Sequence, residues 1–271
     1  MKDIQTSRGD ETLLKVVTLH DIFKQNAMCL AKRLNTIVST NIDEPILYIV
    51  LGAHQNPLLL LELQKKYKCQ YLILNSEHYS SDVLRNKYYL KLLKENYVAD
   101  YLPSNIKQLK LKHDINVLTY FWFEFPQQNQ SMMRPIDILF IGQKNSNRLK
   151  VEEQMKTKYS RLNVQFIYPD KYTDITPILL NAKSVLNIPF YDDNVEMHRI
   201  NHALACGCNV ISHSLGNLNE LYKHFIYIAD DYEPQDIEPR QPYEVLVENQ
   251  LNNIQTHFNW TVNQIRTDAR V

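Results

Sequence analysis

The 271-residue chain has no excess of charge of either sign, because 30 lysines and arginines balance 30 aspartates and glutamates. No stretch of the sequence concentrates basic residues, so no nucleic acid is expected as a partner. Long hydrophobic runs are also missing. The runs 46–51 and 58–61 fall far short of the about 20 residues that cross a bilayer, which predicts no transmembrane segment. The polar start, Met1 to Gln5, lacks the apolar core of a secretion signal and favours the cytoplasm.

Cysteine and glycine are both scarce. The 4 cysteines have no spacing typical of a disulfide framework, so we expect reduced thiols. The 5 glycines are about a quarter of average usage, so each marks a place where the backbone needs one. Gly52 and Gly142 follow apolar runs and predict sharp strand exits, whereas Gly207 follows a helical pattern and predicts a left-handed helix cap.

Short apolar runs rich in β-branched residues alternate with amphipathic stretches along the chain. This order is typical of parallel strands that crossover helices bury on both faces, so we expect an α/β fold. Strands are expected near 14–18, 46–51, 70–75, 98–101 and 115–122, and again near 136–141, 163–168, 184–190, 208–212 and 225–229. Helices are expected near 21–36, 56–66, 82–96 and 104–111, and near 146–158, 173–181, 195–206 and 217–223.

A polar interval, 127–131, interrupts this alternation before Pro135 and is typical of a linker. We therefore predict two Rossmann-like domains, 1–130 and 131–271, the second ending in a helix near 241–257. In open parallel sheets, ligands bind beyond the carboxyl ends of the strands. Two such domains facing a central cleft would place their functional residues directly after the apolar runs.

One stretch of the second half combines a strand, a loop and a helix that starts near residue 195. Glu196, Arg199 and His202 form a polar stripe that begins at the N-terminus of this helix. The free amides and the dipole of a helix start favour a phosphate, and the arginine adds a rigid donor fork, so a diphosphate is the expected ligand. In the alternative interpretation, Arg199 pairs with Glu196 on a solvated surface.

A zinc site is a second interpretation of the same stretch, which carries five residues of the ligand types: His198, His202, Cys206, Cys208 and His213. No paired Cys-x-x-Cys is present, and the two cysteines flank a helix-to-strand turn. Buried structural thiols are therefore favoured, and no metal site is predicted.

Two segments carry a family resemblance. Residues 199–212, RINHALACGCNVIS, resemble the donor-site helix and following strand of retaining GT-B glycosyltransferases of the group 1 type. Residues 137–148, DILFIGQKNSNR, resemble the first strand and donor loop of the same domain in a subgroup of uncharacterised and viral glycosyltransferases. The sequence departs from the family pattern at Asn194 and His202, which stand where that family has glutamates.

The resemblance implies roles for residues of the second domain. The diphosphate would be bound by the donor loop at Gly142 and by the cationic side chains of Lys144, Arg148 and Arg199. These cations would take the place of a metal ion. The donor pocket would be lined by Asn187, Tyr191 and Glu196, and its nucleoside end by Glu220 or His202.

In the first domain, His20, His54 and Glu77 each follow an apolar run, and the segments 52–54 and 75–78 resemble the acceptor domain of that subgroup. An imidazole or a carboxylate there would remove the proton of the acceptor hydroxyl.

The expected function is therefore transfer of a hexosyl or pentosyl group from a nucleoside-diphosphate sugar to a hydroxyl of a glycan or similar acceptor, with no metal and no cofactor. Two alternatives remain open: a nucleotide-sugar epimerase, and a noncatalytic nucleotide-sugar-binding or scaffold protein. The richness in Asn, Lys, Ile and Tyr is compatible with an AT-rich viral or bacterial genome.

Overall fold

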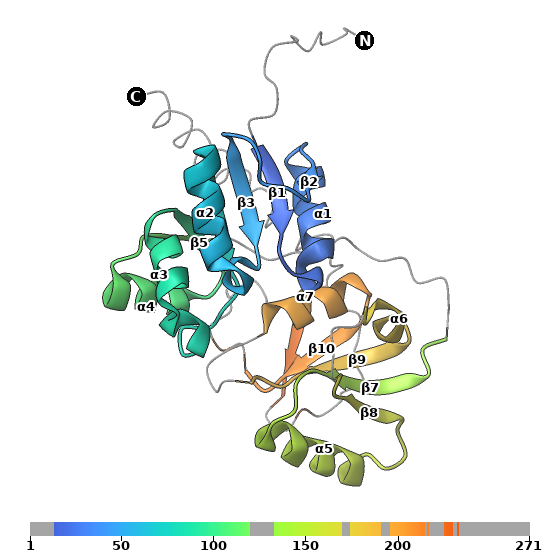
Figure 1. Cartoon of the computed structure of the whole chain (residues 1–271). Helices are drawn as coiled ribbons and strands as arrows, with labels where there is room; N and C mark the ends of the chain where they lie inside the picture. The colour runs from blue at the N-terminus through green and yellow to red at the C-terminus, as the bar shows by residue number, and fades with distance from the viewer. Residues whose placement is uncertain are drawn as a thin grey trace, which may run out of the picture. The chain divides into compact units, whose positions relative to one another are not determined.

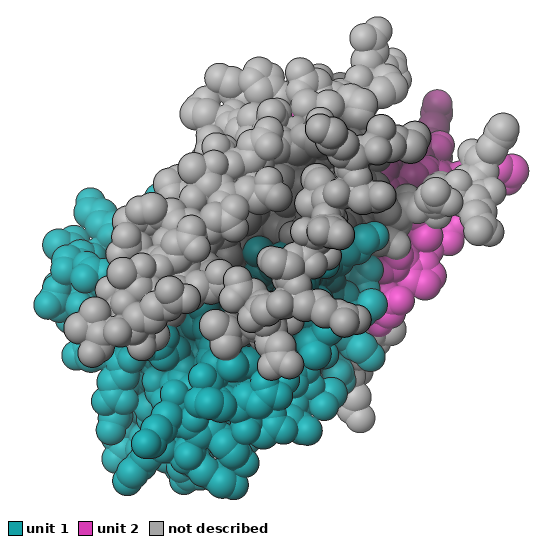
Figure 2. Space-filling view, turned by 90° about the horizontal axis from the view of Figure 1, so that it is seen from above, with its two compact units in different colours: residues 1–120 teal, residues 121–271 magenta. Residues whose placement is uncertain are grey.

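The computed structural model describes residues 14–119, 133–169, 174–190, 196–214, 216, 225–229 and 232. The chain divides into two compact units, residues 1–120 (unit 1) and residues 121–271 (unit 2), which Figure 2 colours teal and magenta. The predicted boundary at 130/131 and the predicted helix near 241–257 lie outside the described residues.

Unit 1 is a six-stranded, wholly parallel sheet with the strand order β2-β1-β3-β4-β5-β6 (Figure 1). Its strands are β1 (Leu14–Thr18), β2 (Val38–Ser39), β3 (Leu47–Leu51), β4 (Gln70–Asn75), β5 (Tyr97–Asp100) and β6 (Val117–Thr119). Its helices are α1 (Lys24–Arg33), α2 (Pro57–Tyr67), α3 (Lys87–Lys94) and α4 (Pro103–His113), joined by the short 3-10 helices η1 (Asp21–Phe23), η2 (Ala53–Gln55) and η3 (Asp82–Arg85).

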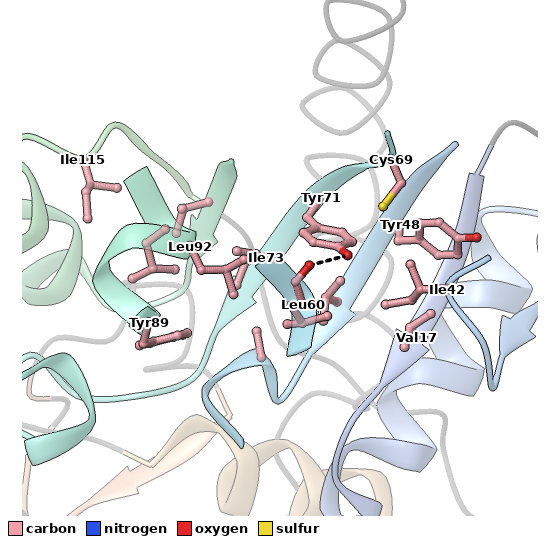
Figure 3. Close-up of a cluster of buried hydrophobic side chains, with 14 of the residues drawn as sticks. Val17, Ile42, Tyr48, Leu60, Cys69, Tyr71, Ile73, Tyr89, Leu92 and Ile115 are labelled. Atoms are coloured by element: carbon pink, nitrogen blue, oxygen red, sulfur yellow. Dashed lines mark hydrogen bonds between the residues drawn. The ribbon is translucent and has the colours of Figure 1, made fainter. Parts of the chain in front are cut away.

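One face of this sheet packs on α2, α3 and α4 through a large apolar cluster (Figure 3). Val50 and Ile73 of the central strands belong to it together with Leu92 of α3. Tyr71 is also fully buried there, and its hydroxyl donates to the carbonyl of Leu60 at 3.0 Å. A buried hydroxyl left without a partner costs about 1–3 kcal/mol, so this bond allows a tyrosine in the core.

Unit 2 is a five-stranded parallel sheet with the order β11-β10-β9-β7-β8. Its strands are β7 (Ile136–Ile141), β8 (Val164–Ile167), β9 (Ala182–Asn187), β10 (Asn209–Ser212) and β11 (Ile226–Ile228), and its helices are α5 (Ser146–Lys158), α6 (Thr176–Leu179) and α7 (Met197–Ala205). Val151 and Met155 of α5 pack on Phe140 and Leu186 of the sheet. The predicted α/β class is thus confirmed in both units.

Helix α7 ends in a turn that only a glycine adopts readily. Gly207 has φ +70°, and its amide donates to the carbonyl of Leu204 at 2.9 Å, while the amide of Cys208 donates to that of Ala203 at 2.9 Å. These two bonds form a Schellman motif. The left-handed cap that the sequence predicts at Gly207 is confirmed.

The side chain of Arg134 ties this helix end to the sheet. Its Nη2 donates to the carbonyl of Cys206 at 2.8 Å, and its Nη1 donates to the carbonyl of Ala182 at 2.6 Å. A Cβ at position 207 would lie 3.1 Å from Nη2, so Gly207 also leaves room for the guanidinium.

Some predicted elements differ from the structure. The helix expected near 82–96 is broken into η3 and α3, because Asn86 caps α3 by accepting from the amides of Tyr88 and Tyr89. The strand expected near 184–190 ends at Asn187, since Pro189 has no amide hydrogen for the sheet ladder. The short edge strand β2 was not predicted. The helix expected near 217–223 lies outside the described residues.

In the part of the chain that the structure describes, no helix has the length and apolar character needed to cross a membrane.

Candidate functional site

Each sheet reverses its winding direction between two neighbouring strands. In unit 1 the chain passes from β1 outward to β2 and then returns to β3 on the other side. In unit 2 the same reversal lies between β7 and β9. Because open parallel sheets bind ligands beyond the carboxyl ends of the strands at such a point, the loops after these four strands are the candidate sites.

Arg148 occupies the first turn of α5, next to the reversal in unit 2, and its side chain is only 1% exposed. Its Nε and Nη2 donate to the carbonyl of Ile188 at 3.1 and 2.7 Å, and its Nη1 donates to that of Gln143 at 2.8 Å. Nη2 also pairs with the carboxylate of Glu196. The guanidinium therefore joins the loop after β7 to the segment after β9.

Arg199 of α7 approaches the same carboxylate from the other side. Its Nη2 pairs with Glu196, its Nε donates to the carbonyl of Ile141 at 2.9 Å, and its Nη1 donates to that of Ile188 at 3.3 Å. Burial lowers the pKa of Arg199, against the opposing effect of Glu196. The predicted alternative of a Glu196–Arg199 pair is therefore present, but it is buried, not solvated, and it includes Arg148.

The two guanidinium groups share one aromatic ring. The Cζ atoms of Arg148 and Arg199 lie 5.0 and 4.9 Å from the ring centroid of Phe140, within the range of a cation–π contact. Gly142 makes room for this arrangement, because a Cβ there would lie 2.7 Å from Nη2 of Arg199 and 3.0 Å from Cζ of Phe140. A larger residue at 142 would displace the arginine.

We call Arg148, Glu196 and Arg199 the arginine–glutamate cluster. Two cations face one carboxylate, so among the described residues the cluster carries a net charge of +1. Glu196 is the most exposed member, at 24% of its side chain, and it also accepts from the amide of Phe190 at 3.1 Å. Two helix N-termini begin here, because Arg148 lies at the start of α5 and Glu196 directly precedes α7. The amides at the start of α7 have no side-chain cap, so this edge of the sheet is suited to an anion.

The other predicted donor residues are placed as follows. Asn187 ends β9 fully buried, donates to Ser212 Oγ at 3.1 Å, and has no hydrogen-bond partner for its Oδ1 among the described residues. Lys144 is exposed, and its Nζ lies 5.6 Å from the ring centroid of Tyr168. His202 contacts Thr176 Oγ1 at 3.0 Å. Tyr191 and Glu220 lie outside the described residues.

The histidines and cysteines that would suit zinc do not gather into a site. Within the described ranges, no group of three or more metal-ligating side chains is present. Cys206 and Cys208 are buried and form no disulfide, and burial raises the pKa of Cys208 to about 11, which keeps it protonated. Burial lowers the pKa of His198 to about 3.

In unit 1, the strand order brings His54 and Glu77 together. His54 follows β3, Glu77 follows the neighbouring β4, and His54 Nε2 lies 3.3 Å from Glu77 Oε1. Burial, assisted by the charge of His20, lowers the pKa of His54 to about 4, and burial raises the pKa of Glu77. The ring is therefore neutral at neutral pH, while the carboxyl moves toward the range in which a general base works best.

His20 lies on the same edge of the sheet but has a structural contact of its own. Its Nδ1 accepts from the amide of Ile22 at 3.1 Å and so caps η1. Its ring contacts Phe23 edge-on, with the centroids 6.1 Å apart, and Phe23 in turn contacts the ring of His54 at 6.5 Å.

Sequence reasoning missed a buried polar network beneath Glu77. Asn75, Tyr89, Asp100 and Asn105 are each at most 1% exposed and bond to one another. A signal was present, because Asn75 and Asp100 end apolar runs in neighbouring strands and are paired in register.

No family model and no curated protein matches the chain. Solved structures resemble it in fold. The crystal structure of Anabaena HepE in complex with UDP and glucose has a TM-score of 0.51 and 10% identity, and the match covers 93% of this chain and 100% of that one. The Glycosylation Associate Protein (Gap123) complex from Streptococcus agalactiae has a TM-score of 0.46 and 14% identity, with 89% and 56% covered. Arabidopsis thaliana UGT89C1 complexed with UDP has a TM-score of 0.40 and 10% identity, with 75% and 67% covered.

The chain thus spans 56% of the length of the Gap123 chain and the whole length of the HepE chain. At 10% identity the likeness to HepE shows the fold alone. These structures come from bacteria and a plant, so the viral part of the sequence resemblance gains no support from them.

Proposed function

We propose that the chain is a glycosyltransferase that moves a hexosyl or pentosyl group from a nucleoside-diphosphate sugar to a hydroxyl of a glycan or similar acceptor. The observation that carries the proposal is the arginine–glutamate cluster, which holds a buried net positive charge between two helix N-termini at the reversal point of unit 2. A phosphate group is the ligand chemistry that such an edge favours.

Within the cluster, Arg199 is the better candidate for direct contact with the diphosphate. Both arginines donate to two backbone carbonyls and to Glu196, but Arg148 makes four such hydrogen bonds and so commits more of its five donors to holding the site together. Arg199 engages three donors in the structure, and a guanidinium has five. The incoming phosphate would compete with Glu196 for these groups, and the protein cations would neutralise the leaving nucleotide in place of a metal ion.

The likeness to HepE supports the same assignment, because that fold neighbour was crystallised with UDP and glucose. Unit 1 would supply the proton acceptor for the hydroxyl nucleophile. Glu77 is preferred over His54 for this role, since burial raises the pKa of Glu77 toward neutrality and lowers that of His54 to about 4. The central cleft between the two domains and the cytoplasmic location stay predictions.

The experiment measures UDP binding by calorimetry for the unaltered chain, Arg199→Gln and the control Lys183→Gln. Lys183 carries the same charge in the same unit but pairs with Asp137 at the surface. Loss of a charge-assisted hydrogen bond should weaken binding by about 1.5–3 kcal/mol in Arg199→Gln and leave the control unchanged. Equal affinity in all three proteins would remove the donor site.

A second measurement separates the proposal from its alternatives. A glycosyltransferase releases nucleotide at a rate that rises with the acceptor, whereas an epimerase alters the donor sugar without releasing nucleotide. Binding of nucleoside-diphosphate sugars with neither reaction would support a noncatalytic binding or scaffold protein.

A further inference from the structure

The backbone carbonyl of Glu77 is held by two side-chain amides from different elements. Asn75 at the end of β4 donates its Nδ2 to this oxygen at 3.0 Å, and Asn105 in the first turn of α4 donates its Nδ2 at 2.8 Å. The amide of Glu77 contacts Asn75 Oδ1 at 3.4 Å. The backbone on both sides of the Glu77 side chain is therefore fixed relative to the sheet.

Asp100 determines how both amides point. Its Oδ2 accepts from Nδ2 of Asn75 at 2.6 Å and from Nδ2 of Asn105 at 2.9 Å, while its Oδ1 accepts from the amide of Leu102 at 2.8 Å. Each Nδ2 has two hydrogens, and these bonds use all four. A closed ring of hydrogen bonds is thus formed by Asp100, Asn75, the Glu77 carbonyl and Asn105. Rotating either side-chain amide by about 180° would break two hydrogen bonds of this ring.

A second layer secures the same orientation. The hydroxyl of Tyr89 donates to Asn75 Oδ1 at 2.7 Å, and the amide of Tyr79 donates to Asn105 Oδ1 at 2.8 Å. The side chains of Asn75, Asp100 and Asn105 are fully buried. Burying a carboxyl and two amides costs more free energy than an apolar core of the same size, so stability alone does not explain this ring. A fixed geometry at Glu77 does explain it.

We propose that Asp100 is a positioning residue which, through Asn75 and Asn105, holds the Glu77 carboxylate against the ring of His54. The role of Glu77 as the group that takes the proton of the acceptor hydroxyl rests on the proposed function. The geometric part, a fixed carboxylate 3.3 Å from His54 Nε2, stands on the contacts alone.

Asp100→Asn keeps the shape and disrupts the ring. An amide in place of the carboxylate must present its NH₂ group either to the two donors of Asn75 and Asn105 or to the amide hydrogen of Leu102. The new NH₂ group then faces another hydrogen-bond donor, so the ring of hydrogen bonds is broken. The loop that carries Glu77 is held less rigidly as a result. The titratable groups near the Glu77 carboxyl are His54 of η2, whose Nε2 lies 3.3 Å from Oε1, and Tyr89 of α3, whose pKa is raised by burial first and also by the charges of Glu77 and Asp100.

The test follows the titration of the Glu77 carboxyl carbon by NMR in the full-length chain and in three variants. A carboxyl released from its fixed, buried position should titrate nearer its ordinary range. Asp100→Asn should therefore lower the pKa of Glu77, and Asn105→Ala should do so as well although it keeps the charge of Asp100. The control is Asn96→Ala, because the side chain of Asn96 also bridges elements of unit 1, namely α2 at Gln64, β4 at Tyr71 and α3 at Leu92, and none of these bonds is to Glu77.

Kinetics provide the second readout. A misplacement of about 1 Å can cost about a hundredfold in rate, so both ring variants should lose roughly tenfold to a hundredfold in kcat. KM for the donor and its dissociation constant should stay unchanged, and the acidic limb of the pH–rate profile should move to lower pH. Asn96→Ala should lower the melting temperature and leave the profile in place.

The outcomes separate the two proposals. Folded Asp100→Asn and Asn105→Ala proteins with an unaltered Glu77 titration would overturn the positioning role. A change in Asp100→Asn alone would overturn it too, since the effect would then come from the charge. If the chain shows no transferase activity while the Glu77 titration responds to both variants, the proposed function fails and the positioning role stands.

Discussion

Replacing His54 with glutamine should change how the stability of unit 1 depends on pH. Burial, with the charge of His20 as a second cause, lowers the pKa of His54 from 6.5 to about 4 in the folded chain. The unfolded chain keeps a pKa of about 6.5. Between pH 6.5 and pH 4 the imidazole is protonated in the unfolded chain but neutral in the folded chain. The contribution of His54 to the free energy of unfolding is therefore full above about pH 6.5 and falls as the pH is lowered to about 4.

The size of this effect follows from the two pKa values. At about 1.4 kcal/mol for each pH unit, the difference amounts to about 3 kcal/mol across the window. The side chain of His54 is 10% exposed, so solvent screening removes little of it. Asp100 acts in the opposite sense, because burial raises its pKa from 3.8 to about 7 and its folded form gains a proton first as the pH falls. In the unaltered chain the effects of His54 and Asp100 on the pH dependence of the unfolding free energy oppose each other. In His54→Gln only the effect of Asp100 remains of these two.

The assay is amide hydrogen exchange at the buried strand residues Val50 and Ile73 between pH 4 and pH 7. The stability of His54→Gln relative to the unaltered chain should rise by about 3 kcal/mol as the pH is lowered through the window. His113→Gln on α4 is the comparison: burial, assisted by the charges of Lys94 and Lys112, also lowers the pKa of His113, but this side chain is only partly buried, so a smaller change of the same sign is expected. A difference that stays constant between pH 6.5 and pH 4, or an NMR titration of the His54 ring near its ordinary pKa, would refute the reasoning.

Four further predictions concern unit 2, the start of α3 and the metal requirement. Arg148→Met should destabilise the protein by about 1–3 kcal/mol in urea unfolding, because the carbonyl of Gln143 loses its guanidinium donor while Glu196 and the carbonyl of Ile188 keep Arg199, and an unchanged stability would contradict this. Gly142→Ala should weaken UDP binding with a stability loss of about 1–3 kcal/mol, since the new methyl group displaces Arg199; calorimetry with unchanged affinity would count against it. Asn86→Ala should lower the free energy of unfolding by about 1 kcal/mol in the same unfolding assay through loss of the α3 cap, and an unchanged free energy would show that the cap does not stabilise the protein. Transferase activity should persist in excess EDTA, and complete loss restored by Mn²⁺ would exclude the metal-free mechanism.

Strand exits were the part of the site that the sequence could predict. Apolar runs are visible without a structure, and the sequence predicts His54 and Glu77 as site residues because each follows one. Their pairing required the strand order, which places β3 beside β4. Asn75 lies at the end of the predicted strand 70–75, and its partner Asp100 comes 25 residues later. Asn105 joins the ring through Asp100 and the Glu77 carbonyl, so the ring is a property of the tertiary fold.

The arginine–glutamate cluster shows a different limit. Arg199 and Glu196 are three residues apart, and their pairing was foreseen as one of two alternatives. The sequence does not predict the burial of Arg148, because its carbonyl partner at Ile188 is 40 residues away and a surface arginine of a helix has the same local pattern. The sequence predicts Gly142 as a strand exit that contributes to the diphosphate site, and the structure shows that its missing side chain leaves room for Arg199.

The contacts of Arg134 have a practical consequence for dissecting the protein. This side chain closes the C-terminal end of α7 and reaches the start of β9, although it precedes both elements by more than forty residues. Unit 2 produced on its own therefore has to begin upstream of Arg134. A fragment that starts at β7 would lack the guanidinium, and the carbonyls of Ala182 and Cys206 would need water in its place. We expect such a fragment to fray first at the end of α7, the helix whose other end adjoins the arginine–glutamate cluster.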